Sequence, residues 1–193
     1  RKALKLPSPR LLVESLRVSG FTYLDRRIDK DLDEVALGQR PPDAIAVNPG
    51  NSNVIYAGGC EGSAASLYKT TNGGGLWFSS STGISSDTMY DIAIHPGNNS
   101  IVFAGTRNGL YKSVNDGATW TNKGCVGVKS VLVDPEDPTT VYAGTSYGVY
   151  KSMDTGETWS SLNEGLRDSC ITSLGIYPGT FLFAGTREDG MYR

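Results

Sequence analysis

The residues of this chain that could do acid–base chemistry are few. His95 is the single histidine among 193 residues, so a multi-histidine metal site is excluded by count. It stands directly before Pro96, and the corresponding position elsewhere in the chain holds Asn48, Asp134 or Tyr177. This placement predicts a turn residue and argues against a Ser-His-Asp triad.

Carboxylates are more numerous, but no pair has the placement that a hydrolase needs. Glu188 and Asp189 are neighbours in sequence, and neighbouring side chains of an extended segment point apart. Glycoside hydrolysis needs two carboxylates that flank the scissile bond. Asp91 or Asp168 could meet another acid across a channel, a separation that spacing alone does not give. We therefore predict no catalytic residue, no metal site and no cofactor.

The three cysteines, Cys60, Cys125 and Cys170, show no metal-ligand spacing. An odd number leaves at least one thiol unpaired within the chain. One disulfide with a free thiol and three buried thiols are both compatible with this pattern.

Charge is distributed unevenly along the chain. The net charge is −2, but residues 1–30 carry eight Lys or Arg against three acids, which leaves −7 on the remainder. We therefore expect no nucleic-acid binding by the repeat body.

No apolar run reaches the roughly 18 residues of a membrane span, so we expect no integral membrane segment. The first ten residues are too polar for a secretory signal peptide, which is either absent or removed.

The elements that must position these residues come from an internal repeat. Each unit opens with an apolar run that ends in a proline, and Pro49, Pro96, Pro135 and Pro178 are 47, 39 and 43 residues apart. A polar turn leads to a second run with an Ala-Gly pair. A third run ends in a Tyr-Lys or Tyr-Arg pair, and an eight-residue box with a tryptophan follows in the first three units. Each part predicts a short strand.

Four short strands per unit of about 40 residues are typical of a β-propeller blade. We predict an all-β propeller of four-stranded Asp-box blades, with about three and a half blades visible. Residues 1–42 are expected to form a non-repeat segment, either a degenerate blade with a strand over residues 18–24 or a linker. The repeats occupy residues 43–193, in units 43–88, 89–127, 128–170 and 171–193.

The box reads Ser-Val-Asn-Asp-Gly-Ala-Thr-Trp from Ser113 to Trp120, and it recurs over residues 70–77 and 152–159. A tight turn between the third and fourth strands needs positive φ, which suits the box glycine. The Asn or Asp two positions earlier can accept hydrogen bonds from turn amides, and we expect the tryptophan ring to be buried between sheets. We predict a structural role for Thr70, Asn72, Gly74, Trp77, Ser113, Asn115, Gly117, Trp120, Ser152, Asp154, Gly156 and Trp159. The Ala-Gly pairs are expected where neighbouring sheets approach closely.

Function is expected in the loops that differ between units. In a propeller, the turns between first and second strands lie on one face with the boxes. The loops between second and third strands lie on the other face, together with the connections between blades. This second face, called the loop face below, carries an insertion over residues 59–65. Guanidinium groups beside tyrosines suit a carboxylate, sugar or peptide ligand. The predicted partner-binding residues are Arg107, Lys129, Tyr147, Arg167, Arg187, Glu61 and Tyr90.

The chain resembles the BNR/Asp-box superfamily of β-propellers over residues 43–193. The resemblance rests on the proline-ended strands, the runs Val-Tyr-Ala-Gly-Thr at 141–145 and Gly-Val-Tyr-Lys-Ser at 148–152, and the boxes. Members include sialidases, xyloglucan-degrading glycoside hydrolases, sortilin-like receptor domains and photosystem II assembly-factor propellers. The resemblance implies the fold, whereas activities differ among members. The sialidase arginine trio and tyrosine nucleophile, and the catalytic aspartates of the xyloglucan enzymes, have no matching motif here.

We therefore expect a non-enzymatic binding or scaffold module that recognises a protein or glycan partner through its loop face. The alternative is a glycoside hydrolase, sialidase-like or xyloglucanase-like, of which this chain is a part. We expect an extracellular, periplasmic or lumenal location. Propellers generally have four to eight blades. The open edge of three and a half blades is therefore expected to be covered by residues 1–40, by another chain or by missing sequence.

Overall fold

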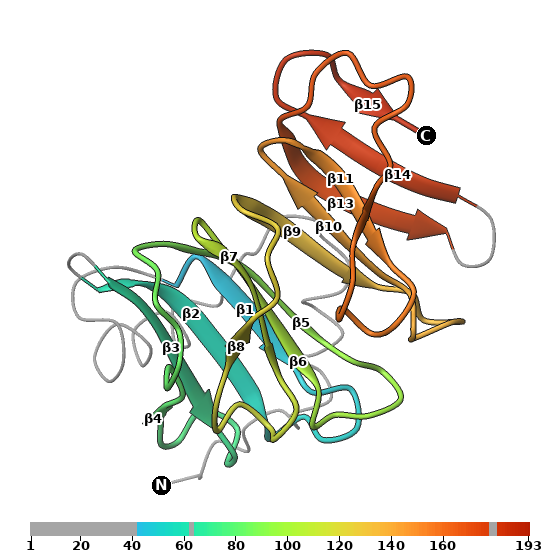
Figure 1. Cartoon of the computed structure of the whole chain (residues 1–193). Helices are drawn as coiled ribbons and strands as arrows, with labels where there is room; N and C mark the ends of the chain where they lie inside the picture. Colours follow the sequence, from blue (N-terminus) through green and yellow to red (C-terminus); the bar gives the residue numbers. More distant parts are fainter. Residues whose placement is uncertain (1–41, 62–63, 178–180) are drawn as a thin grey trace, which may run out of the picture.

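The computed structural model describes residues 42–61, 64–177 and 181–193, and within them it contains fifteen β-strands and no helix. The described strands form four antiparallel sheets, three of four strands and one of three. Figure 1 shows these sheets, called blades 1 to 4, following one another in an open arc. The predicted all-β propeller with an incomplete fourth blade is confirmed. The expectations for residues 1–41 concern a part of the chain outside the described residues.

Each blade is a meander, in which consecutive strands pair. Blade 1 comprises β1 (Ala44–Val47), β2 (Ile55–Glu61), β3 (Ala64–Thr70) and β4 (Phe78–Ser79). Blade 2 comprises β5 (Met89–Ile94), β6 (Val102–Thr106), β7 (Gly109–Ser113) and β8 (Thr121–Asn122). Blade 3 comprises β9 (Val128–Val133), β10 (Val141–Thr145), β11 (Gly148–Ser152) and β12 (Ser160–Ser161). Blade 4 comprises β13 (Ile171–Tyr177), β14 (Phe181–Thr186) and β15 (Met191–Tyr192).

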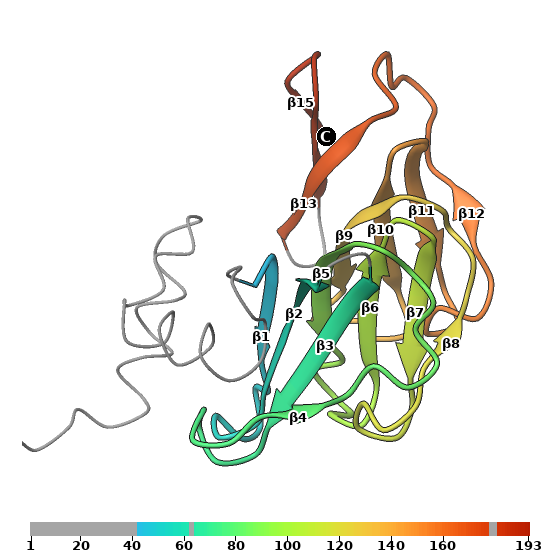
Figure 2. The ribbon, with the colours of Figure 1, turned by 90° about the vertical axis from the view of Figure 1, so that its left-hand side faces the viewer.

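The first strands of successive blades, β1, β5, β9 and β13, contact one another in turn. Figure 2 shows the outer strands β8 and β12 on the side of the molecule away from β1 and β13. None of the described segments forms a helix with the length and hydrophobicity needed to cross a bilayer.

The core lies between blades. The first buried cluster joins blades 1 and 2, and it includes Tyr56, Leu67, Met89, Tyr111 and Trp120. A second joins blades 2 and 3 through Phe103, Leu110, Val128 and Val141, and a third joins blades 3 and 4 through Val149, Ile171 and Ala184. Burial of a large apolar side chain stabilises a fold by about 1.5–3 kcal/mol, so each junction contributes substantially.

The Ala-Gly pairs allow this close packing, as predicted. A Cβ atom on Gly58 would lie 2.1 Å from Sδ of Met89 in the next blade. On Gly144 it would lie 2.7 Å from Cγ2 of Ile171, again in the next blade. Real Cβ atoms do not approach neighbours so closely, because the repulsion would force the sheets apart.

The boxes form the predicted turns. Gly74, Gly117 and Gly156 have φ of 98°, 80° and 83°, and the residue before each also has positive φ. In the second box Oδ1 of Asn115 accepts a hydrogen bond from the amide of Thr119 at 2.9 Å. The hydroxyl of Ser113 accepts one from the amide of Gly117 at 2.9 Å. The box side chains therefore supply the acceptors that the turn backbone needs.

Two boxes also join neighbouring blades. The Tyr56 hydroxyl of blade 1 donates to Asp116 Oδ1 of the second box at 2.8 Å, and Lys69 forms an ion pair with the same carboxylate. Burial and the neighbouring Asp116 raise the pKa of Tyr56 above its ordinary value. At the next junction Lys112 and Lys123 of blade 2 pair with Glu157 of the third box, at 2.7 and 2.6 Å.

The predicted burial of the tryptophan rings is confirmed for Trp120, whereas Trp159 and Trp77 are only partly buried. Trp120 is buried in the first cluster and its Nε1 donates to the Ser80 carbonyl of blade 1 at 2.6 Å. Trp159 packs against the second cluster. Trp77 is half-buried, and its Nε1 donates to the Gly74 carbonyl of its own box at 3.1 Å.

Two details differ from the expected strands. The fourth strands have only two residues and begin after the tryptophan. In blade 2 the Trp120 amide bonds to the Thr82 carbonyl of the connection from the preceding blade, at 2.9 Å, and not to its own sheet. The insertion over residues 59–65 lengthens the hairpin: Gly59 pairs with Ser66 and Cys60 with Ala65. It therefore extends β2 and β3 more than it extends the loop.

Candidate binding face

The loop face is built from the loops between second and third strands and from the connections between blades. In blades 2 to 4 a backbone hydrogen bond of 3.0 to 3.1 Å ties the loop to the connection before it: Arg107 N to Thr88 O, Ser146 N to Gly127 O, and Arg187 N to Cys170 O. These bonds hold the loops of successive blades in the same relation to the sheets.

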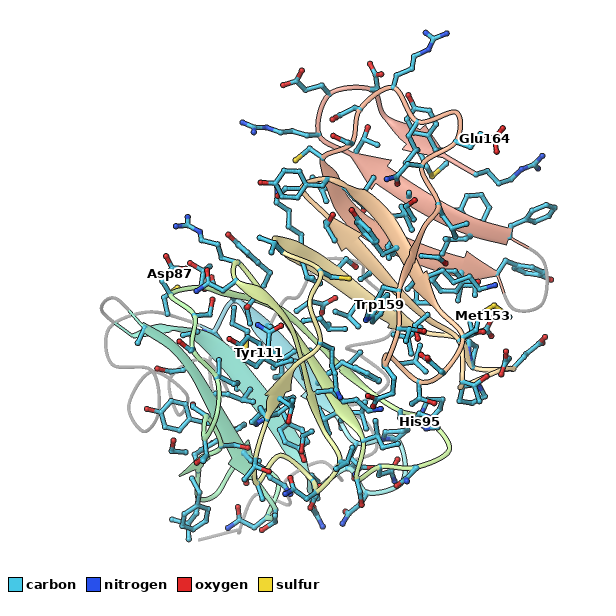
Figure 3. All side chains as sticks on the ribbon, viewed as in Figure 1. Asp87, His95, Tyr111, Met153, Trp159 and Glu164 are labelled. Carbon is cyan, nitrogen blue, oxygen red and sulfur yellow. The ribbon has the colours of Figure 1, made fainter. Side chains whose placement is uncertain are left out.

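The opposite face carries the boxes, as predicted. In each box, one backbone amide donates a hydrogen bond to a carbonyl of the turn between the first and second strands of the same blade. The pairs are Gly73 with Asn53, Asp116 with Ser100, and Thr155 with Thr139. Figure 3 shows the two faces, with Asp87 and Glu164 on the upper side and His95 and Met153 on the lower side.

His95 is a turn residue on this opposite face, which confirms its predicted role. Its Nδ1 accepts hydrogen bonds from the amides of Gly97 and Asn98, at 3.1 and 2.9 Å. Oδ1 of Asn48 accepts equivalent bonds from the amides of Gly50 and Asn51 in blade 1. Burial lowers the pKa of His95, which keeps the acceptor nitrogen free of a proton.

One group of polar side chains lies at the junction of blades 1 and 2. Arg107 forms an ion pair with Asp87 at 2.9 Å, and its side chain is 60% exposed. The hydrogen bond to Tyr90 and the charge of Asp87 raise the pKa of Arg107. The Sγ of Cys60 donates to the Asp87 carbonyl at 3.0 Å. The structure thus brings together the predicted residues Arg107 and Tyr90, and it adds Asp87, which no motif in the sequence singles out.

A second group lies at the junction of blades 3 and 4. The Asp168 carboxylate accepts hydrogen bonds from the amides of Cys170 and Glu188, both at 2.8 Å. These amides lower the pKa of Asp168. Nζ of Lys129 lies 3.1 Å from Sγ of Cys170. Lys129, a predicted partner-binding residue, therefore contacts a thiol of the neighbouring blade.

The remaining predicted residues are placed separately. Tyr147 is 62% exposed in the loop of blade 3. Arg167 and Arg187 are exposed in the connection before β13 and in the loop after β14. Glu61 ends β2, at the tip of the lengthened hairpin.

Asp91 is partly buried in β5, where its carboxylate accepts hydrogen bonds from backbone amides of blades 2 and 3. Its Oδ1 accepts a hydrogen bond from the amide of Ile92 at 2.9 Å, and its Oδ2 accepts one from Val131 of the next blade at 2.7 Å. Burial raises its pKa from 3.8 to about 6. Asp91 and Asp168 thus both accept hydrogen bonds from backbone amides through their two carboxylate oxygens.

The three cysteines are free thiols and all are partly buried. Of the two arrangements compatible with the sequence, the structure has the one without a disulfide. Burial raises the pKa of Cys125 to about 11, so its thiolate is scarce at neutral pH. Across the described residues, no three His, Cys, Asp or Glu side chains gather in a way that could hold a metal ion.

Three described boxes, four stacked sheets and a loop face together define an Asp-box β-propeller. The chain belongs to the family of the DUF6242 beta propeller domain, whose model matches residues 41–172. A search of curated proteins gave no match.

Solved structures show the same fold. The GH74 enzyme of Niastella koreensis is 26% identical with a TM-score of 0.61, over 75% of this chain and 26% of that enzyme. An ancestral GH74 enzyme is 22% identical with a TM-score of 0.67, over 83% of this chain and 23% of the other. Ycf48 bound to a D1 peptide is 14% identical with a TM-score of 0.55, over 80% of this chain and 51% of the other. The chain thus spans about a quarter of the two GH74 enzymes. It is a propeller domain similar to a GH74 enzyme, and it shares its fold with Ycf48.

Proposed function

We propose that this propeller is a non-catalytic binding module that recognises a protein or glycan partner through its loop face. The proposal rests on how charged side chains are used there. Asp91 and Asp168 direct both carboxylate oxygens at amides within the protein, and Oδ2 of Asp87 pairs with Arg107. Tyr147, Arg167 and Arg187, in contrast, are exposed to solvent.

Exposed guanidinium groups and a tyrosine on fixed loops suit recognition of carboxylates, hydroxyls and peptide carbonyls. The three backbone hydrogen bonds between loops and connections hold the loops in place, so the loops lose less conformational entropy when a partner binds. A rigid face with exposed donors is therefore suited to binding, whereas catalysis would need acids turned toward the ligand.

A glycoside hydrolase is the second candidate. Two observations favour it: the similarity to a GH74 enzyme at 26% identity, and the pKa of about 6 for Asp91, a value that suits a general acid. The hydrogen bonds of Asp91 to backbone amides of two blades favour a structural role instead.

An array experiment separates the two candidates. The full chain is applied to a glycan array and to an array of acid-containing peptides, and every glycan that binds is assayed for release of reducing sugar. Binding without sugar release supports the binding module. Sugar release that is lost in the Asp91→Asn variant would establish the hydrolase, and absence of binding on both arrays would contradict the proposed function.

A further inference from the structure

Lys129 and Cys170 form an amine–thiol pair across the junction of blades 3 and 4. Nζ of Lys129, in β9, lies 3.1 Å from Sγ of Cys170, which directly precedes β13. Groups that react with each other in proteins are held about 3–3.5 Å apart before the bond forms. The nitrogen and the sulfur therefore already lie at a distance from which they can react. Binding of a partner through exposed loop residues makes no use of this contact.

Hydrogen bonds fix the backbone on both sides of the pair. The amide of Cys170 donates to Oδ1 of Asp168 at 2.8 Å, and its carbonyl accepts a hydrogen bond from the loop of blade 4 at 3.0 Å. Next to Lys129, Oγ of Ser130 accepts a hydrogen bond from the amide of Leu174 in blade 4, at 3.2 Å. The two blades therefore need no rearrangement to bring the nitrogen to the sulfur, which lowers the entropic cost of a bond between them.

The other two cysteines have different surroundings. Sγ of Cys60 donates to the carbonyl of Asp87 at 3.0 Å. Cys125 packs against the second apolar cluster, and burial raises its pKa to about 11. All three cysteines are partly buried, so access to solvent does not separate them. What distinguishes Cys170, among the contacts of the described residues, is a primary amine beside its sulfur.

We propose that Lys129 and Cys170 are a modification site, at which hydrogen peroxide drives formation of a covalent S–N bond between blades 3 and 4. In the first step Sγ of Cys170 attacks one oxygen of the peroxide, and the O–O bond breaks. The sulfur is oxidised by two electrons and the peroxide is reduced. The leaving hydroxide takes the thiol proton and becomes water, and the product is a sulfenic acid.

The second step needs no further oxidant. Nζ of Lys129, after its ammonium group has released a proton to solvent, attacks the sulfur. The S–N bond forms as the S–O bond breaks, and the leaving hydroxide takes a proton from the nitrogen to become a second water. The product is a sulfenamide, which sulfenic acids also form with backbone nitrogen atoms. A dithiol reductant restores both residues and is itself oxidised to a disulfide.

The test treats the full chain with hydrogen peroxide and measures its mass without reductant. We expect the loss of two hydrogen atoms, about 2 Da, and its reversal by dithiothreitol. Digestion with trypsin is expected to give a linked pair of peptides that contains Lys129 and Cys170, without cleavage after Lys129. The linked pair is read directly in the wild type, so the test does not depend on whether a variant folds.

Lys129→Arg is the matched control, because it keeps the positive charge but replaces the amine by a guanidinium that stays protonated. We expect this variant and Cys170→Ser to form no link. Cys60→Ser and Cys125→Ser are expected to form it as the wild type does. Circular dichroism checks that each variant is folded.

Three results would overturn the proposal. The first is a wild type that gains one oxygen, about 16 Da, at Cys170 and forms no link. The second is a loss of two hydrogen atoms that persists in Lys129→Arg, which would indicate a disulfide between cysteines. The third is an unchanged mass at millimolar peroxide. None of these measurements involves a ligand, so they are separate from the test of the proposed function.

Discussion

Trp120 reaches from the box of its own blade to the blade before it. Its ring is buried in the first cluster and its Nε1 bonds to Ser80 of the preceding blade. Trp77 has the same place in the first box, but it is half-buried and bonds to Gly74 in its own turn. The two tryptophans therefore form a natural comparison.

We expect Trp120→Ala to lower the free energy of unfolding by about 3–5 kcal/mol, the usual cost of emptying a buried aromatic site. Trp77→Ala, the matched control, should cost much less because its ring is half-buried. Urea unfolding followed by circular dichroism measures both. Equal losses for the two variants would contradict the packing described for the first junction.

The raised pKa of Asp91 predicts that the free energy of unfolding depends on pH. Its pKa is about 6 in the folded chain against an ordinary 3.8. Its protonated form therefore stabilises the fold fully below pH about 3.8, and this contribution is lost as pH rises through 6. The raised pKa corresponds to about 3 kcal/mol.

The Asp91→Asn variant lacks this titration, while the other acids are common to both proteins. We expect the difference in unfolding free energy, wild type minus variant, to fall by up to about 3 kcal/mol between pH 4 and 7. Denaturant titrations at several pH values measure it. Parallel stability curves would show that burial does not perturb Asp91.

At the scale of elements, the molecule depends on sheets that pack face to face through glycines. Gly144 faces Ile171 of blade 4, whereas a Cβ on Gly175 in β13 would meet nothing within 4 Å. Neither residue has positive φ, so the comparison isolates packing from backbone strain.

We expect Gly144→Ala to lower the free energy of unfolding by about 1–3 kcal/mol through overpacking. Gly175→Ala should be neutral or slightly stabilising, since alanine is better tolerated than glycine in a strand. Thermal unfolding of the two variants provides the measurement. A destabilised Gly175→Ala with an unaffected Gly144→Ala would be incompatible with the described blade contacts.

The elements were largely predictable from the sequence because each box, proline and Ala-Gly pair has a local cause. Contacts between blades were not, since they depend on how one sheet rests on the next. The hydrogen bond from Tyr56 to Asp116 links residues sixty positions apart, and neither the strand around Tyr56 nor the second box predicts it. The partial burial of Asp91 has the same origin, because the amide of Val131 in the next blade donates one of its hydrogen bonds.

At the scale of the whole molecule, an open arc of blades displays one face of boxes and one of loops. The sequence predicted this division, and it predicted Arg107 and Tyr90 for the loop face, which the structure places together. Asp87 could not be predicted from the sequence, because its ion pair with Arg107 forms only where the connection between blades 1 and 2 meets the loop of blade 2. Lys129 contacts Cys170 across a blade junction for the same reason.

The most direct test of binding through the loop face is an isothermal titration of whichever array ligand binds. It compares the wild type, a loop-face variant with Arg107→Ala, Tyr147→Ala and Arg187→Ala, and a box-face control with Val114→Ala and Met153→Ala. The control replaces exposed side chains of the other face. We expect the loop-face variant to bind at least tenfold more weakly, and the control to match the wild type. Unchanged affinity in the loop-face variant, or a loss confined to the control, would contradict the proposed function.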